Sequence, residues 1–124
     1  MEKLLLVDDV EAARAIARLY LKDMDVEVDE AADGIRAVEL FCAGSYCLVL
    51  LDLEMPVLGG LEAVRAMRAD EARANRPRTP ILALTAHDDT THAEACLQAG
   101  CDGILVKPLN RSLLRETVLR HLAS

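Results

Sequence analysis

Five short apolar runs in this chain alternate with five segments whose apolar residues recur at helical spacing. The strand-like runs are predicted at residues 3–7, 26–31, 48–51, 81–84 and 104–106. When helices connect successive strands, each strand enters the sheet in the same direction, so the sheet is parallel. A parallel sheet needs helices on both of its faces. The alternation therefore predicts an α/β domain of three layers around a five-stranded parallel sheet.

The run at residues 26–31 differs from the other four. Val26 and Val28 alternate there with Glu27 and Asp29, so one face of this strand is expected to be wetter. Such a strand belongs at the edge of a sheet. We therefore expect the strand order 2-1-3-4-5, which is the flavodoxin-like (βα)5 arrangement. In this order the chain reverses between the first and third strands, and a crevice opens there at the carboxyl ends of the strands.

Polar residues and glycines mark the expected ends of the helices. Capping side chains precede the second, fourth and fifth helices, at Asp33, Thr91 and Asn110. Gly44 and Gly100 are expected to end the second and fourth helices. The segment at residues 70–80 contains two prolines and is predicted to be a loop or a frayed helix end.

Apolar side chains at helical spacing predict which face of each helix is buried. In the first helix, predicted at residues 11–22, these side chains are Ala13, Ile16, Ala17 and Tyr20. In the second helix they are Ile35, Val38 and Phe41.

The charge balance limits the partners of this chain. Its 124 residues suffice for one domain, and 21 acidic against 14 basic residues give a formal charge of −7. This excess of acid argues against DNA or an anionic membrane as partner, and it suits a site that concentrates a cation. No apolar run is long enough to span a bilayer, and the apolar run at residues 4–7 is too short for a signal peptide, so we expect a cytoplasmic protein. The four cysteines do not have a zinc-ligand spacing and are interpreted as small core residues.

Polar residues follow the strands at the edge of the sheet where a ligand site is expected. Asp8 and Asp9 follow the first strand, Asp52 the third, Thr85 the fourth and Lys107 the fifth. In a parallel sheet these carboxyl ends all lie on one side. We therefore expect three carboxylates, a hydroxyl and an ammonium group to converge from distant parts of the sequence.

The chemistry of this set indicates phosphoryl transfer. Three crowded carboxylates either raise a pKa or bind a cation, and Mg²⁺ prefers carboxylate oxygens. Lys107 would hold a phosphate oxygen, Thr85 would donate a hydrogen bond to another, and Asp52 would be the nucleophile. The alternative is a solvated rim of charges, with Asp52 only capping its loop. We assign the solvated interpretation to four other acidic residues: Glu27, Asp29, Asp70 and Glu71.

Four motifs, VDDVEAAR, LVLLDLEMPVLGG, ALTA and LVKPL, together resemble the response-regulator receiver domain (CheY-like) over essentially the whole chain. The resemblance implies that a sensor histidine kinase or a histidine phosphotransfer protein phosphorylates Asp52. It implies that Mg²⁺ is bound by the carboxylates of Asp8, Asp9 and Asp52 and by the backbone carbonyl of Glu54. It further implies a cis peptide bond between Lys107 and Pro108, and an output face on the fourth helix, fifth strand and fifth helix. That face would bind an output partner or a second copy of the chain.

Three positions depart from the family pattern or modulate it. The family usually has Tyr or Phe three residues before the lysine, and this chain has Ile104. A branched aliphatic side chain cannot swing a ring between a buried and an exposed position. In this family, His87 and Glu54 occupy positions that tune hydrolysis of the phosphoaspartate. We interpret His87 as solvated rather than as a residue that orients water.

Two other functions are open at this point. A Mg²⁺-dependent phosphatase with an aspartyl-phosphate intermediate would want a second acid two residues after its nucleophile, where Glu54 stands. A pseudo-receiver would act only as a binding module, although none of the five site residues is missing. The receiver interpretation makes residues 1–124 one receiver domain without an output domain, a signalling module rather than an enzyme. Such a chain is either a stand-alone receiver or a piece of a longer regulator or hybrid kinase, and residues 70–80 with ALTA look closest to the hybrid-kinase type.

Overall fold

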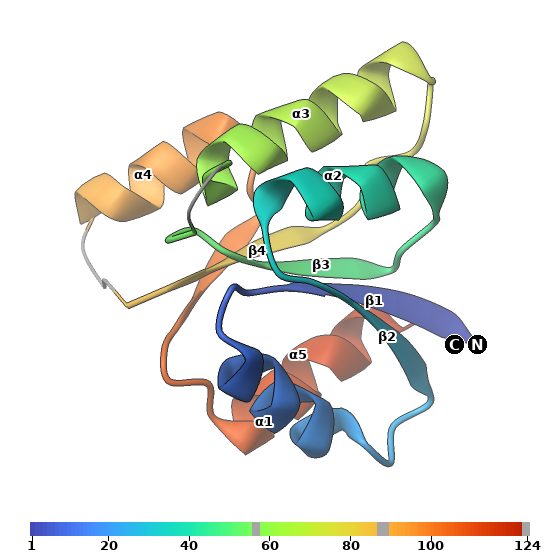
Figure 1. Ribbon diagram of the computed structural model, residues 1–124, viewed down its shortest axis with the longest axis vertical. Coiled ribbons are helices and arrows are strands. Elements are labelled where there is room, and N and C mark those ends of the chain that lie inside the picture. Colours follow the sequence, from blue (N-terminus) through green and yellow to red (C-terminus); the bar gives the residue numbers. More distant parts are fainter. Residues whose placement is uncertain (56–57, 87–89, 123–124) are drawn as a thin grey trace.

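The computed structural model describes residues 1–55, 58–86 and 90–122. A parallel sheet lies between two helical layers, with α1 and α5 on one face and α2, α3 and α4 on the other (Figure 1). The elements in chain order are β1 (Glu2–Val7), α1 (Glu11–Leu21), β2 (Val26–Ala31), α2 (Gly34–Ala43), β3 (Leu48–Asp52), α3 (Gly60–Arg73), β4 (Ile81–Thr85), α4 (Thr90–Ala99), β5 (Gly103–Val106) and α5 (Arg111–His121).

The strand order is β2-β1-β3-β4-β5, as the sequence predicted. β2 forms the edge, and its charged side chains alternate with Val26 and Val28. β3 is buried along its whole length because helices cover both of its faces. β1 pairs with β2 on one side and β3 on the other, so the chain reverses at β1, and β1 and β3 end next to each other at the site.

Two apolar clusters hold the layers together, one on each face of the sheet. In β3, Val49 and Leu51 join the cluster under α2, α3 and α4, whereas Leu48 and Leu50 join the cluster under α1 and α5. This division follows from the period of two in a strand, which sends successive side chains to opposite faces. The apolar residues Leu48 to Leu51 of β3 therefore pack against both helical layers.

The predicted caps of α2 and α5 and the glycine that ends α4 are confirmed. The Asp33 side chain accepts a hydrogen bond of 2.8 Å from the Arg36 amide, and Asn110 caps α5 through the Leu113 amide at 3.0 Å. Gly100 ends α4 with a φ of +118°, a conformation that residues with a Cβ rarely adopt. α4 begins at Thr90, so Thr91 is the second residue of the helix and not its N-cap, and this prediction was wrong.

The predicted buried faces of the first two helices need correction. Ile35 is 50 % exposed and Ile16 is 48 % exposed. In α2 the buried positions are Gly34, Ala37 and Phe41, a repeat of three and four residues that leaves Ile35 about 100° off the stripe. Ile16 likewise precedes Ala17, which lies on the buried face of α1. In both helices an isoleucine lies beside the buried stripe, and the small residue adjacent to it in the sequence, Ala17 or Gly34, lies on the stripe.

Asp70 and Glu71 are buried, so their interpretation as solvated rim charges was wrong. α3 continues through Arg73, and only the rest of the predicted 70–80 loop follows it. Asp70 accepts hydrogen bonds from Arg73 and Arg76, at 2.6 and 2.9 Å. Arginines placed three and six residues later compensate the burial of this charge.

The four cysteines differ in burial. Cys96 and Cys101 are buried in the cluster under α4, as predicted. Cys47 is half-buried. Cys42 is exposed on α2, so for this residue the prediction of a core position was wrong. Among the helices within the described ranges, none is long and apolar enough to cross a membrane.

Candidate functional site

The turn after β1 carries the first two carboxylates. Asp8 is 2 % exposed, and its Oδ1 accepts a hydrogen bond of 2.9 Å from the amide of Val10. The Asp8 amide donates to the carbonyl of Ala31 at the end of β2, at 3.1 Å. Asp9 is exposed beside it. The turn thus presents one buried and one solvated acid from the same strand end.

Asp52 is the last residue of β3 and is 3 % exposed. Its Oδ1 accepts a hydrogen bond of 3.0 Å from the Glu54 amide. The loop returns so closely that a Cβ on Gly60 would lie 2.7 Å from the Asp52 carbonyl oxygen and 2.6 Å from the Leu53 Cα. A glycine at position 60 therefore lets α3 begin directly against the loop that orients Asp52.

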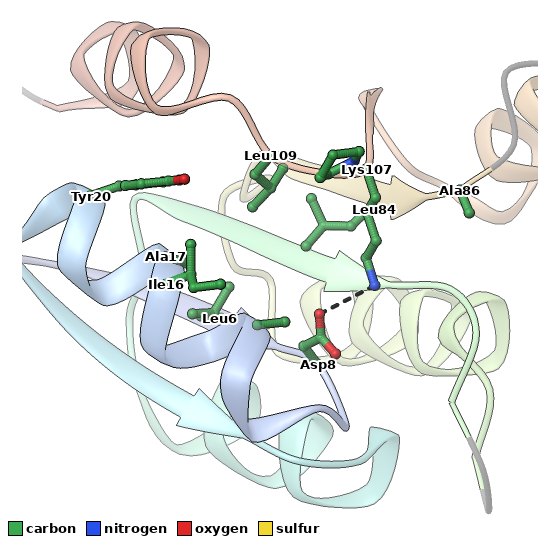
Figure 2. A pocket seen from close by; sticks show the side chains of 11 residues that line it. Leu6, Asp8, Ile16, Ala17, Tyr20, Leu84, Ala86, Lys107 and Leu109 are labelled. Atoms are coloured by element: carbon green, nitrogen blue, oxygen red, sulfur yellow. Dashed lines mark ion pairs between the residues drawn. The ribbon is translucent and has the colours of Figure 1, made fainter.

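Lys107 reaches both buried carboxylates from the end of β5. Its Nζ lies 3.2 Å from Oδ2 of Asp8 and 3.1 Å from Oδ2 of Asp52 (the Asp8 pair is dashed in Figure 2). The Lys107 amide donates to the Thr85 carbonyl at 2.7 Å, which ties the ends of β4 and β5 together. The bond from Lys107 to Pro108 is cis, as the family resemblance implied.

Thr85 is the last residue of β4 and is fully buried. The pairing of β4 with β3 brings the end of β4 next to Asp52. The structure therefore brings the ends of β1, β3, β4 and β5 together and places the Lys107 ammonium against the Asp8 and Asp52 carboxylates, as the strand-end rule predicted. That the Thr85 hydroxyl faces them stays a prediction.

The carboxylate set has the chemistry of a divalent-cation site. One oxygen from each of Asp8, Asp9 and Asp52 lies within 4.8 Å of the others. Two of these acids are buried, and hard oxygen donors of this kind suit Mg²⁺. The donor set fits the predicted metal. That the carbonyl of Glu54 is a further ligand stays a prediction.

The electrostatics of the site follow from burial opposed by a shared cation. Burial raises the pKa of Asp52 above its usual value, and the Asp8 charge adds to this, although the Glu54 amide and Lys107 oppose it. Burial by itself would lower the pKa of Lys107, but the hydrogen bond and charge of Asp52, together with Asp8, raise it. Lys107 is therefore held protonated. Burial makes the ionised form of Asp52 unfavourable, and a bound cation would stabilise that form.

An apolar groove of about 430 Å³ opens beside the site, between α1 and the segment after β5 (Figure 2). Asp8 and Lys107 form its polar end. Its apolar lining includes Ala13, Ile16, Ala17, Leu84, Pro108 and Leu109. The sequence interpretation missed this groove. Its signal was the pair of alanines four residues apart on α1, which leaves space where larger side chains would fill it.

The residue that departs from the family pattern, Ile104, and the modulating residue His87 have different outcomes. Ile104 is half-buried and packs against the cluster under α2, α3 and α4. His87 lies outside the described residues.

Known proteins that resemble this chain include response regulators and sensor kinases. The model of the response regulator receiver domain matches residues 4–119. The sensor protein GacS of Pseudomonas syringae pv. syringae is 37 % identical over 118 residues, which are 95 % of this chain and 13 % of GacS. Other curated relatives are also longer, and the chain spans less than half of them.

Two solved structures carry information about ligands and partners. The receiver domain of the sensor histidine kinase PA1611 from Pseudomonas aeruginosa PAO1, with a magnesium ion in its active site cleft, is 36 % identical with a TM-score of 0.86 and covers 99 % of this chain and 98 % of its own. The receiver domain of Ssk1 from Saccharomyces cerevisiae, in complex with the histidine phosphotransfer protein Ypd1, gives 27 % identity, a TM-score of 0.90 and coverage of 99 % and 93 %.

Proposed function

The chain belongs to the response regulator receiver domain family of two-component signalling, and on that basis we propose that it accepts a phosphoryl group from a phosphohistidine onto Asp52 in the presence of Mg²⁺. The supporting observation is the position of Lys107. Its Nζ lies between Oδ2 of Asp8 and Oδ2 of Asp52, at 3.2 and 3.1 Å. An ammonium group that joins the metal-binding acid to the acceptor acid suits a site that must receive a phosphate oxygen.

The proposed reaction is an exchange of one bond to phosphorus for another. A carboxylate oxygen of Asp52 forms a bond to phosphorus while the bond to the donor's imidazole nitrogen breaks, and the imidazole regains a proton. Mg²⁺ bound by Asp8, Asp9, Asp52 and the Glu54 carbonyl would neutralise the phosphoryl oxygens. Lys107 and the Thr85 hydroxyl would contact the remaining oxygens once the acyl phosphate forms. Phosphorylation adds about −1.5 to −2 units of charge, which the cations offset.

We propose a histidine kinase or a histidine phosphotransfer protein as the donor. The groove between α1 and Leu109 begins at Asp8 and Lys107, so a partner that fills it would have its histidine beside Asp52. Ile16 exposes 48 % of its surface at this groove. An apolar side chain next to the donor histidine fits this surface, because it covers area that is otherwise exposed to water.

The output face is proposed on α4, β5 and α5. Leu97 on α4, Val106 on β5 and Leu113 on α5 are exposed apolar residues within these elements. Ile104 cannot transmit the signal by a ring movement. The hydrogen bond between the Lys107 amide and the Thr85 carbonyl offers a route on this face, since a shift of Thr85 toward a phosphoryl group would move β5 with it.

The test is the intact mass of the protein after incubation with acetyl phosphate and Mg²⁺. We expect one phosphate adduct that is lost in Asp52→Asn and in EDTA. A wild-type protein that stays unmodified by acetyl phosphate, by a phosphorylated phosphotransfer protein and by beryllofluoride would contradict the proposal. An adduct that survives in Asp52→Asn would contradict the assignment of the acceptor.

A further inference from the structure

The guanidinium of Arg14, on α1, contacts the backbone of the turn that carries Asp8 and Asp9. Its Nη1 donates a hydrogen bond of 2.7 Å to the Asp8 carbonyl oxygen. Its Nε donates to Oε1 of Glu30 on β2 at 3.0 Å. The Arg14 side chain is only 15 % exposed, although an arginine in the first turns of a surface helix is ordinarily solvated. This long side chain therefore packs between α1 and the end of β2.

We propose that Arg14 is a positioning residue that orients the Asp8–Asp9 peptide for metal binding, an inference that rests on the proposed function. The Asp8 carbonyl and the Asp9 amide belong to one planar peptide unit. A hydrogen bond to that carbonyl therefore sets the direction in which both acidic residues leave the turn.

The Asp8 residue is held from three directions. β1 ends at Val7, so the Asp8 carbonyl lies past the ladder that β1 forms with β2. The Asp8 amide bonds to Ala31, the Asp8 carboxylate accepts from Val10, and the Asp8 carbonyl accepts from Arg14. With the peptide held in this way, Oδ2 of Asp8 points to Lys107 and toward the acceptor carboxylate. Loss of the Arg14 contact would leave the carbonyl free to rotate toward solvent.

Charge and positioning predict opposite effects for this residue. Arg14 is a cation close to a cation site, so by Coulomb repulsion alone its removal would tighten metal binding. Positioning predicts that its removal weakens metal binding, because partners in the outer shell of a metal site commonly contribute tenfold or more to affinity. The Glu30 carboxylate, which pairs with Arg14, offsets part of the Arg14 charge and reduces the repulsive effect.

Arg18 provides a matched control. It also pairs with Glu30, through Oε2, from the next turn of α1. Arg18→Met and Arg14→Met therefore remove the same charge and a salt bridge to the same carboxylate. Of the two arginines, Arg14 is the one with a hydrogen bond to the Asp8 carbonyl.

The experiment measures binding of Mn²⁺, a paramagnetic substitute for Mg²⁺, by electron paramagnetic resonance on the folded proteins. We expect Arg14→Met to weaken binding by roughly tenfold and Arg18→Met to change it by less than about twofold. Arg14→Lys retains one donor without the planar fork, so we expect it to recover part of the affinity. Circular dichroism and urea denaturation check that each variant is folded.

A second measurement needs no metal. The Val10 amide donates to the Asp8 carboxylate, so its hydrogen exchange reports the order of the turn. In EDTA we expect exchange at Val10 to accelerate on the order of tenfold in Arg14→Met and to be unchanged in Arg18→Met. If Arg14 only stabilised the helix, Arg14→Met would accelerate hydrogen exchange across the whole of α1 rather than at the Val10 amide.

The outcomes separate this inference from the function on which it rests. Equal or tighter Mn²⁺ binding in a folded Arg14→Met would overturn the inference and leave the metal site intact. Equal losses in Arg14→Met and Arg18→Met would overturn it as well, because the Asp8 contact would then be irrelevant. A wild-type protein without Mn²⁺ affinity would overturn both this inference and the proposed metal-dependent function.

Discussion

Lys107 Nζ lies 3.1 Å from Oδ2 of Asp52, although the two residues end strands that are separated by β4. The side chain spans the end of β4 and also reaches Asp8, at 3.2 Å. One ammonium group thus compensates two buried carboxylates of the site. The contact requires three parallel strands whose carboxyl ends are in register, and it could not arise between neighbours in the sequence.

Replacing Lys107 by methionine should make the folded state depend on a divalent cation. The two buried carboxylates would lose their shared partner, and the pKa of Asp52 would rise further because Lys107 opposes its elevation. We expect a loss of about 1–3 kcal/mol in the free energy of unfolding in EDTA, much of which Mg²⁺ restores. Urea denaturation with and without Mg²⁺ measures this. Lys3→Met, which removes a partly exposed pair with Asp29, should show no Mg²⁺ dependence beyond that of the wild type.

Asp52→Asn should stabilise the protein in the absence of metal. The asparagine oxygen can keep the hydrogen bond from the Glu54 amide, and one of the crowded negative charges disappears. We expect a gain on the order of 1 kcal/mol at neutral pH, together with a smaller stabilisation by Mg²⁺ than in the wild type. Glu27→Gln removes an exposed charge of the same sign on β2 and controls for net charge. If the variant and the wild type have the same free energy of unfolding in EDTA, the three carboxylates do not repel one another in the folded state.

Asp102 should make stability depend on pH in the acid range. It accepts hydrogen bonds from the Ile81 amide at 2.8 Å, from Arg68 at 2.8 Å and from Arg78 at 3.0 Å. Burial by itself would raise the pKa of Asp102, but these contacts lower it below its usual value. Because the pKa of Asp102 is lower in the folded state, ionised Asp102 stabilises the fold fully at pH values above its unfolded pKa, about 3.9. This stabilisation disappears as the pH falls through the lower folded pKa.

We therefore expect Asp102→Asn to be less stable than the wild type by about 1–3 kcal/mol at pH near 7. The difference should narrow as the pH falls below about 4, because the wild type then loses the same ionic contacts. Urea denaturation across this range checks the sign. The exposed Asp25→Asn should match the wild type throughout, and a gap for Asp102→Asn that widens in acid would refute the argument.

Ile16→Glu should separate two kinds of phosphodonor. Position 16 lines the groove and does not contact Asp52, so the rate of phosphorylation by acetyl phosphate should be unchanged. Transfer from a phosphorylated phosphotransfer protein should slow by roughly tenfold, because a buried charge weakens docking by more than 1.4 kcal/mol. Intact mass over time measures both reactions. Leu119→Glu places the same charge on an exposed apolar position of α5 outside the groove and should leave both rates unchanged.

The cysteines should react with a maleimide in two classes. Cys96 and Cys101 are buried, and burial raises the pKa of both thiols, to about 12 for Cys101. Cys42 is exposed, although partial burial and the Asp70 carboxylate raise the pKa of its thiol. We expect the native protein to be modified first at Cys42 and all four positions to react in urea. Rapid labelling of Cys96 in the native state would show that α4 opens from the core.

Much of the fold could be predicted from the sequence because its signals are local. A four-residue apolar run is long enough to identify a strand with two covered faces, as β3 proved to be. The alternation along residues 26–31 placed β2 at the edge. The strand-end rule then brought Asp8, Asp52 and Lys107 to one side of the sheet, where the structure has them.

The errors have two physical origins, of which the first is the pairing of buried acidic side chains with nearby donors that composition alone does not reveal. Glu71 was predicted to be solvated, yet it is buried because Arg68 pairs with it at 2.8 Å and the Thr79 amide donates to it at 2.7 Å. The rotation of a helix about its axis also decides burial. Ile35 was placed on the buried face, whereas the packing of Gly34 and Phe41 turns it outward.

The sequence by itself determined the order of the elements, the parallel sheet and the residues that end its strands, since these depend on periods of two and 3.6 residues. The tertiary structure alone decided that Lys107 contacts both Asp8 and Asp52, that Arg14 reaches the Asp8 carbonyl, and that small side chains on α1 leave a groove beside the site. Contacts of this kind depend on how far one element is shifted and rotated against another. The packing of the whole core sets those displacements, and no local period encodes them.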